Sequence, residues 1–485
     1  MTFIGPSPSH VDALPSGRAV ALGEETDGAS DALPGHVSQD ALRYQLSESD
    51  VTDAAWEVSG QMVSVADDNW DGMRDVYCQV RETEAGRFTL ALNTDRDNWK
   101  RGAHVQLGGP GHVEEWDCAT GERFRIPARW HGRWLEFDAD FAPGGEHLWL
   151  VTDQADRKIP LRPTFREVSR TGLAGPFAYE LDEPNVCVLD RARYRLNGGE
   201  WSDELEILKA DRVLRRSLGL PLRGGEMAQP WFASHQEHPV VGRLELRFEL
   251  DVDDLPTSPV YLALETPKAF TVTVNDTQLD PEAADGWWVD CAFVKLPVPA
   301  GALRPGRNVV ALETDFRDDI DLEALYLLGE FGVRVDGTRR TLAKLPECLA
   351  VGDVVPQGLP FYTGKITYLL GAAPAVGDAS RVFLELGEFE GACAAVPMSD
   401  GRRAMMAWPP YEADITADAG TKWCVGLEVV LTRRNVFGPL HQVPLDTTGY
   451  GPGNWISEGR HFSEGYNLYT SGLLEPPNWV VRKVE

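Results

Sequence analysis

Residues 243–250 read Arg-Leu-Glu-Leu-Arg-Phe-Glu-Leu, a strict alternation of charged and apolar side chains. Successive side chains of a β-strand point to opposite faces, so this octapeptide predicts a strand with one buried and one solvated face. Similar alternation returns at 260–264, 270–274 and 309–314. Short strands at this spacing are typical of a sandwich, and we predict a jelly-roll-like β-sandwich over residues 236–345.

The next part of the chain, residues 346–485, repeats this pattern. Alternating runs lie at 366–370, 382–386, 392–396 and 424–431. This weak internal duplication predicts a second jelly-roll-like sandwich in series with the first. The chain nowhere shows the eight strand–helix alternations of a (β/α)8 barrel.

The N-terminal half predicts three further regions. Residues 76–156 alternate in short strands broken by Gly, Pro and Asn-Asp, which predicts a small β-sandwich. Residues 157–235 are expected to form a connecting region with one helix. Residues 1–75 hold the only stretch of mixed α/β character and are interpreted as a small N-terminal α/β segment. The predicted fold class is therefore mainly β, with several β-sandwich domains in series.

The helix of the connecting region is predicted over residues 202–218. Ser202 is its expected N-cap, and acidic residues follow in the first turn. Arg215 and Arg216 suit the negative end of the helix dipole, and Gly219 suits a left-handed residue after the last turn.

Composition limits the classes of partner. The chain has 485 residues, too many for one core, and a formal net charge of −29. Such a charge repels nucleic acids and anionic membranes, so we expect neither as a partner. Neutral sugars are not repelled, and the 15 tryptophans provide many aromatic faces.

The cysteines and the N-terminus predict the compartment. Seven cysteines form no CxxC pair, and their odd number predicts free thiols. The start, Met-Thr-Phe-Ile-Gly-Pro, has no basic and apolar leader, and no run of 18 apolar residues follows. We therefore expect a cytoplasmic protein.

Three segments resemble carbohydrate-active enzymes. Residues 91–94 (Ala-Leu-Asn-Thr) and 113–122 (Val-Glu-Glu-Trp-Asp-Cys-Ala-Thr-Gly-Glu) resemble a segment after the catalytic barrel of α-L-rhamnosidase-like enzymes of glycoside hydrolase family 106. Residues 296–310 resemble the L-x-x-G-x-N-x-I pattern of galactose-binding-like sandwiches, also present in family 2 β-glycosidases. Residues 407–416 and 434–441 are similar to the C-terminal domain of the family 106 enzymes.

The resemblance covers residues 76–156 and 236–485 and implies galactose-binding-like jelly rolls. In that family the catalytic carboxylates and a calcium site belong to an N-terminal barrel, which has no counterpart here. No catalytic residue can therefore be transferred. The resemblance implies the sugar-binding half of such an enzyme, with an oligo- or polysaccharide ligand and a separate chain that carries the barrel.

Two groups of residues are candidates for sugar binding. The first is Trp287, Trp288 and Asp290, because an indole face stacks on a sugar ring while a carboxylate accepts hydroxyl groups. In a strand only one of the two tryptophans can face the core, and packing at a domain interface is the alternative. The second group is Trp408, Tyr411, Arg434, Asn435 and His441. Turn capping and packing on the sandwich are the alternative there.

Acidic clusters suggest two weaker hypotheses. Glu385, Glu388 and Glu390 follow a predicted strand and could form a catalytic acid pair, but an ordinary solvated strand end explains them as well. A second cluster, Asp315, Asp318, Asp319 and Asp321, offers oxygen ligands for a structural calcium ion, although its spacing matches no EF-hand. We expect no other cofactor.

Two functions follow from the sequence. The first is a non-catalytic, sugar-binding accessory half or subunit of an α-L-rhamnosidase-like glycoside hydrolase. The alternative is a free-standing hydrolase of rhamnosyl or related glycosides that uses carboxylates not yet identified.

Overall fold

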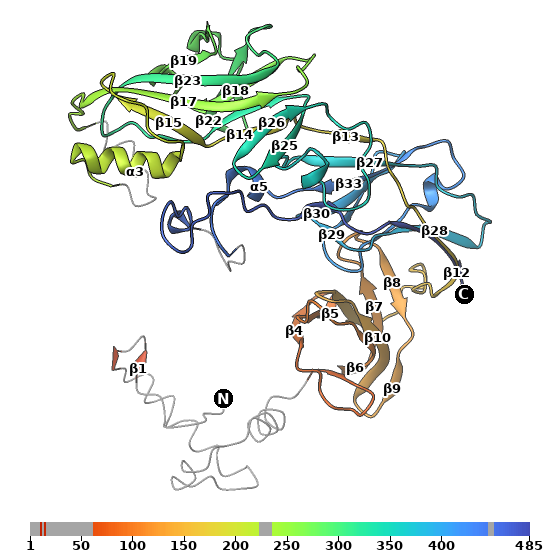
Figure 1. The fold of residues 1–485 in the computed structure, drawn as a ribbon. Coiled ribbons are helices and arrows are strands. Elements are labelled where there is room, and N and C mark those ends of the chain that lie inside the picture. The colour runs from red at the N-terminus through yellow and green to blue at the C-terminus, as the bar shows by residue number, and fades with distance from the viewer. Residues whose placement is uncertain (1–9, 12–13, 16–61, 223–234, 445–450) are drawn as a thin grey trace. The chain divides into compact units, whose positions relative to one another are not determined.

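A computed structural model describes residues 10–11, 14–15, 62–222, 235–444 and 451–485 (Figure 1). The chain forms two compact units, Met1–Arg162 and Pro163–Glu485. In the N-terminal stretch, β1 (His10–Val11) pairs with β2 (Leu14–Pro15). Most of the expected α/β segment at 1–75 lies outside the described residues. Of its described residues, 62–75 contain β3 (Val63–Ala66), which pairs with β6 (Lys100–Gly108) of the small β-sandwich, so the predicted boundary at residue 76 is wrong.

The first unit contains the predicted small β-sandwich, made of two antiparallel sheets. One sheet has the order β3 (Val63–Ala66), β6 (Lys100–Gly108), β10 (Trp134–Phe141) and β9 (Arg129–His131). The other has the order β4 (Val76–Thr83), β5 (Gly86–Asn93), β11 (Glu146–Thr152), β7 (His112–Trp116) and β8 (Arg123–Ile126). Buried apolar side chains such as Val105, Leu107 and Trp149 fill the space between the sheets.

The second unit holds two sandwiches. In the first, one sheet has the order β14 (Asn185–Leu189), β24 (Leu325–Gly329), β18 (Val260–Glu265), β22 (Asp290–Val298) and β21 (Trp287–Trp288). The other has the order β16 (Leu205–Glu206), β15 (Arg191–Leu196), β17 (Gly242–Val252), β23 (Gly306–Phe316), β19 (Thr271–Val274) and β20 (Thr277–Gln278). The hairpin β25 (Gly332–Asp336) and β26 (Arg339–Ala343) joins this sheet through a parallel pairing of β26 with β17.

The octapeptide 243–250 lies in β17 and behaves as its pattern predicts. Leu244, Leu246, Phe248 and Leu250 are buried in the core of the first sandwich. The alternate charged residues lie on the opposite face of the strand.

The second sandwich closes the C-terminal half. One sheet has the order β12 (Phe165–Gly172), β35 (Asn478–Val484), β28 (Ser380–Glu385) and β32 (Glu412–Asp414). The other has the order β13 (Tyr179–Leu181), β27 (Lys365–Gly371), β33 (Val425–Val430), β30 (Cys393–Pro397) and β31 (Arg403–Met406). A short pair, β29 (Phe389–Glu390) and β34 (Gly472–Leu473), lies beside them.

The two sandwiches are nested rather than strictly in series. β12 and β13 precede the first sandwich in the sequence, yet they pair with β35 and β27 of the second. Residues 157–235 are therefore not a plain connector, because their strands belong to both sandwiches. The physical reason is that the backbone N–H and C=O groups of a strand are satisfied only by a neighbouring strand. That neighbour can be distant in the sequence, as β35 is for β12 and β27 is for β13.

The helix of this region is α3 (Ile207–Leu218), and its predicted start at Ser202 is wrong. Ser202 donates its backbone N–H to the carbonyl of Tyr194 in β15, 2.8 Å away, and lies outside the helix. The N-cap is Glu206, whose side chain accepts the N–H groups of Leu208 and Lys209. The predicted end is confirmed, since Arg215 and Arg216 occupy the last turn and Gly219 adopts φ 68°.

The other helical segments within the described residues are short. They are η3 (Pro267–Ala269), η4 (Pro281–Ala283), η5 (Val355–Gln357), η6 (Thr416–Asp418), α5 (Arg434–Phe437) and η7 (Pro452–Asn454). All seven cysteines are free, as predicted, and Cys187 is buried. Within the described ranges, no helix has the length and apolarity needed to cross a bilayer.

Candidate functional site

A polar pocket of about 220 Å³ opens on the first sandwich of the second unit. Its walls come from the segment before β16, from β17, from the start of β23 and from the β25–β26 hairpin. The lining residues are Glu204, Glu249, Leu250, Asp251, Arg307, Thr338, Arg339 and Arg340. Strand alternation positions the β17 members, because Leu250 points into the core and its two acidic neighbours therefore face the pocket.

Carboxylates and guanidinium groups face one another around this pocket. Arg339 Nε lies 2.6 Å from Asp251 Oδ2, and Arg307 Nη1 lies 3.4 Å from Glu249 Oε2. Both arginine side chains are largely exposed, whereas Asp251 is mostly buried. The pocket thus presents hydrogen-bond donors and acceptors side by side.

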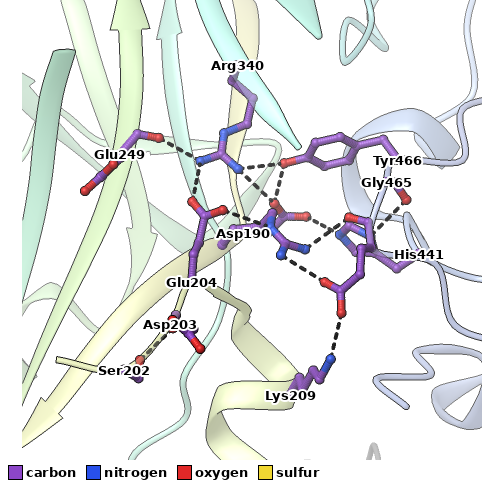
Figure 2. A network of polar contacts seen from close by, with 12 residues as sticks. Asp190, Ser202, Asp203, Glu204, Lys209, Glu249, Arg340, His441, Gly465 and Tyr466 are labelled. Atoms are coloured by element: carbon purple, nitrogen blue, oxygen red, sulfur yellow. Dashed lines mark hydrogen bonds and ion pairs between the residues drawn. The ribbon is translucent and has the colours of Figure 1, made fainter. Parts of the chain in front are cut away.

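Arg340 forms the inner wall and is almost completely buried. It donates from Nη2 to the backbone carbonyl of Glu249 at 2.7 Å and from Nη1 to the hydroxyl of Tyr466 at 3.1 Å. Asp190 and Glu204 lie 3.9 and 4.0 Å from its guanidinium nitrogens. Arg340 therefore joins the pocket to the polar network shown in Figure 2.

Asp190 is the centre of that network. It follows β14 directly and is buried. Its Oδ2 lies 3.0 Å from His441 Nε2, and its Oδ1 accepts the hydroxyl of Tyr466 at 2.5 Å. His441 Nδ1 lies 2.9 Å from the carbonyl of Ser463 and 3.2 Å from the carbonyl of Gly465, and Figure 2 shows the second contact. The network therefore connects the first sandwich to the C-terminal segment around residues 441–466.

Burial and charge shift the pKa values of this network. Burial alone would lower the pKa of His441, but the hydrogen bond and negative charge of Asp190 raise it above the ordinary value. Burial would raise the pKa of Asp190, and His441 and Arg340 together hold it below the ordinary value. Burial also raises the pKa of Glu206, the N-cap of α3, to about 7.

A ring of ion pairs surrounds this centre. The backbone carbonyl and the carboxylate of Glu464 both accept from Arg191, at 3.0 and 2.9 Å. Lys209 of α3 lies 2.7 Å from the same carboxylate. Arg191 also approaches Glu204 of the pocket at 3.4 Å. These ion pairs hold Glu204 in place where the pocket meets the network.

The first predicted sugar-binding group is divided by the structure. Trp287 is 57% exposed, whereas Trp288 is 5% exposed and packs against Phe293, Tyr326 and Phe437. Asp290 accepts the backbone N–H of Ala292 at 2.8 Å. The expectation that one tryptophan faces the core is confirmed. Trp288 is a core residue whose ring faces are occupied, so its assignment to ligand stacking is corrected.

The second group is spread over different contacts. Asn435 is buried and clamps Tyr469, donating to its carbonyl at 2.7 Å and accepting its N–H at 2.8 Å. Tyr411 packs edge-on against Phe389, and Arg434 lies over the Tyr469 ring. Trp408 is exposed. Of this group, His441 belongs to the network beside the pocket, and buried Asn435 has the alternative role of capping a loop.

Three members of the two acidic clusters, Glu385, Asp318 and Asp319, form ion pairs. Glu385 lies 2.5 Å from Arg170 and 3.4 Å from Arg482. The structure gives no carboxylate contact that joins it to Glu388 or Glu390. In the other cluster, Asp318 lies 2.7 Å from His238, and Asp319 lies 2.9 Å from Arg317.

The second cluster also has partial metal-site geometry. One ligand atom each from His238, Asp318 and Asp319 lies within 4.8 Å of the others. These include two of the four aspartates considered for calcium. Internal pairing with His238 and Arg317 accounts for their arrangement.

Sequence reasoning missed most of the pocket and network. Asp190-Arg191 follows the fully apolar run 186–189, and a charged pair directly after a buried strand was a usable signal. Arg307 lies in residues 296–310, which the sequence analysis used only for their resemblance to galactose-binding-like sandwiches. Tyr466 and Glu464 carry no local pattern, because their roles arise from contacts with residues more than 250 positions away.

The fold and pocket define the second unit as a pair of nested β-sandwiches with a small polar cleft. No family model and no curated protein matches the chain. Among solved structures, a rhamnosidase from Novosphingobium sp. PP1Y is similar over 58% of this chain and 26% of its own, with 13% identity and a TM-score of 0.20.

A second similar structure is BpGH86A, a β-porphyranase of glycoside hydrolase family 86 from Bacteroides plebeius. The match covers 53% of this chain and 37% of that one, with 9% identity and a TM-score of 0.14. This chain thus spans well under half the length of either structure. Both TM-scores are far below the value that indicates a shared fold, so the fold assignment rests on the strands and their pairing.

Proposed function

We propose that this chain is a carbohydrate-binding accessory protein, the non-catalytic half or subunit of an α-L-rhamnosidase-like glycoside hydrolase. The observation that carries the proposal is the pocket in which Arg307 and Arg339 face Glu249 and Asp251. Sugar hydroxyl groups both donate and accept hydrogen bonds, and this lining offers guanidinium donors beside carboxylate acceptors.

The size of the pocket suits a small neutral ligand. Its volume of about 220 Å³ lies below the range of roughly 300–1,000 Å³ typical of drug-sized ligands. Three arginines and three acidic residues line it, so their formal charges cancel. One sugar unit at the end of a glycan chain matches both properties, and an anionic or cationic ligand has no advantage there.

The pairing of the acids supports binding rather than catalysis. Glycoside hydrolysis needs one protonated carboxyl group and one carboxylate on either side of the bond. In the pocket, Asp251 and Glu249 are each paired with an arginine, at 2.6 and 3.4 Å, rather than with each other. Glu206 has a raised pKa, but it is buried and caps α3 through both oxygens. The described residues therefore support a binding role, with a barrel supplied by another chain as the proposed source of catalysis.

The test is calorimetric titration of the full chain with L-rhamnose and a panel of other neutral monosaccharides. We expect the chain to bind at least one sugar, and we expect Arg307→Ala to bind it roughly 10- to 100-fold more weakly, because the loss of a charged donor costs roughly 1.5–3 kcal/mol. Arg243→Ala is the matched control, since Arg243 pairs with Glu313 across the same two strands but does not line the pocket. Absence of binding by every sugar, or equal binding by Arg307→Ala and wild type, contradicts the proposal.

A further inference from the structure

The outer face of the β3–β6–β10–β9 sheet in the first unit carries a ladder of three polar pairs. Gln106 donates to Glu136 at 2.8 Å, and His104 lies 2.7 Å from Asp138. At the bulge near the end of β10, Arg101 lies 2.8 Å from Asp140. The first two pairs are direct cross-strand partners in the register of β6 and β10. We call these six residues the β6–β10 ladder.

Two tryptophans stack on this ladder. The Trp70 ring lies parallel to His104, with centroids 4.8 Å apart and an interplanar angle of 16°. The guanidinium carbon of Arg101 lies 3.6 Å from the centre of the Trp99 ring. Trp70 is 56% exposed and Trp99 is 39% exposed. Each indole therefore has one face on the ladder and much of its remaining surface open to solvent.

An ordinary solvated sheet face explains only part of this arrangement. Polar cross-strand pairs are expected on the outer side of an antiparallel sandwich. They do not require exposed indoles, which are apolar and large. Trp70 is moreover held at φ 65°, a left-handed conformation that is rare for bulky side chains. The apolar residues of the same strands, Val105 and Leu107, already face the core on the other side.

We propose that the β6–β10 ladder, with Trp70 and Trp99, is a binding platform for a neutral glycan chain. The apolar C–H face of a sugar ring stacks on an indole, while its hydroxyl groups exchange hydrogen bonds with the polar pairs. The two indoles stack on His104 and Arg101, which lie three residues apart in β6, about 10 Å at the rise of an extended strand, so we infer that they engage successive parts of one chain. The three carboxylates of the ladder and the net charge of −29 repel an anionic polysaccharide.

This platform adds a second sugar site to the proposed function, on a different domain from the pocket. Its ligand is an extended chain, whereas the pocket suits one sugar unit. The two sites can therefore fail separately. Arg307→Ala should weaken monosaccharide binding and leave polysaccharide binding by the ladder unchanged.

The experiment is native affinity electrophoresis of the full chain in gels that contain xyloglucan, galactomannan, mixed-linkage β-glucan or a neutral rhamnan. We expect at least one of these to retard the wild type, and Trp70→Ala and Trp99→Ala each to weaken binding about tenfold. Trp70→Phe should retain part of the affinity. Trp423→Ala, which removes an exposed tryptophan of the second sandwich, is the control and should migrate like the wild type.

Three outcomes overturn the inference. One is that none of the four polysaccharides retards the wild type. Another is equal retardation of the wild type and the Trp70→Ala/Trp99→Ala double variant. The third is a change in self-association of the double variant without any change in glycan binding, which assigns the indoles to a protein contact. Because both side chains are exposed, the variants should keep the unfolding midpoint of the wild type.

Discussion

Asp190 Oδ2 and His441 Nε2 lie 3.0 Å apart although 251 positions separate them in the sequence. Both side chains are buried, and the pair joins the end of β14 to the C-terminal segment. Breaking a buried pair leaves an uncompensated charge, which costs more than the loss of a surface contact. This pair therefore ties the C-terminal segment to the first sandwich.

We predict that Asp190→Asn and His441→Gln each lower the free energy of unfolding by about 3–5 kcal/mol. Urea denaturation followed by tryptophan fluorescence measures the change. The double variant should lose less free energy of unfolding than the two single variants lose in sum, because the two residues interact directly. Exposed His112→Gln is the control and should stay within about 0.5 kcal/mol of the wild type. If the loss of free energy in the double variant equals the sum of the two single losses, Asp190 and His441 are not coupled.

The free energies of unfolding of the wild type and of Glu206→Gln should differ by an amount that changes with pH, because the pKa of Glu206 is raised. The pKa of Glu206 is about 7 in the folded state, whereas the ordinary pKa of a glutamate is 4.5, so folding binds a proton in this range. Stability from this group is thus present below about pH 4.5 and is lost as pH rises through 7. The wild type should lose on the order of 3 kcal/mol relative to the variant across this window.

The measurement for Glu206 is a series of urea denaturations from pH 4 to 8 for both proteins. His441 contributes a loss of the same sign, since its pKa is also raised, and the negative charge of Glu206 is one cause of that raise, so the two contributions are coupled and both enter the difference between the proteins. If the difference in the free energy of unfolding between the wild type and Glu206→Gln does not change with pH, the pKa of Glu206 is not raised.

Truncation of the two adjacent tryptophans should have very different effects on the free energy of unfolding. Trp288→Ala should lower the free energy of unfolding by about 3–5 kcal/mol, because it opens a cavity among Phe293, Tyr326 and Phe437. Trp287→Ala should change it by no more than about 0.5 kcal/mol. Chemical denaturation of both variants makes the comparison, and equal losses would contradict the packing described for β21.

The proposed accessory role predicts negligible turnover of aryl α-L-rhamnosides by the purified full chain. Release of the aryl group, followed by absorbance, should not exceed the buffer background. Glu385→Gln should leave this result unchanged, since Glu385 is engaged by Arg170 and Arg482. Turnover that disappears in Glu385→Gln or Glu388→Gln would instead establish a free-standing hydrolase.

Local patterns were sufficient for the strands and for one end of the helix. The octapeptide 243–250 predicts β17 because side-chain alternation is a property of neighbouring residues. The same rule separates Trp287 from Trp288. Gly219 ends α3 as predicted, because a left-handed residue after the last turn is favoured by glycine itself.

The start of the helix was predicted wrongly for a tertiary reason. Ser202 is a good N-cap by residue type, but its N–H bonds to Tyr194, and its hydroxyl accepts the N–H of Tyr194 at 3.0 Å. Pairing with β15 thus uses the groups that would cap a helix. The cap passes to Glu206, four residues later.

The sequence by itself determined the mainly β class and, for strands such as β17 and β23, both the position and the buried face, because these depend on the period-2 alternation within a few residues. Only the tertiary structure decided that β12 and β13 complete the second sandwich, and that Asp190, Arg340 and His441 share one network beside the pocket. Strand pairing and buried ion pairs depend on which distant surfaces match in shape and charge. No local period encodes that match, since it is set by the energy of burying many residues together.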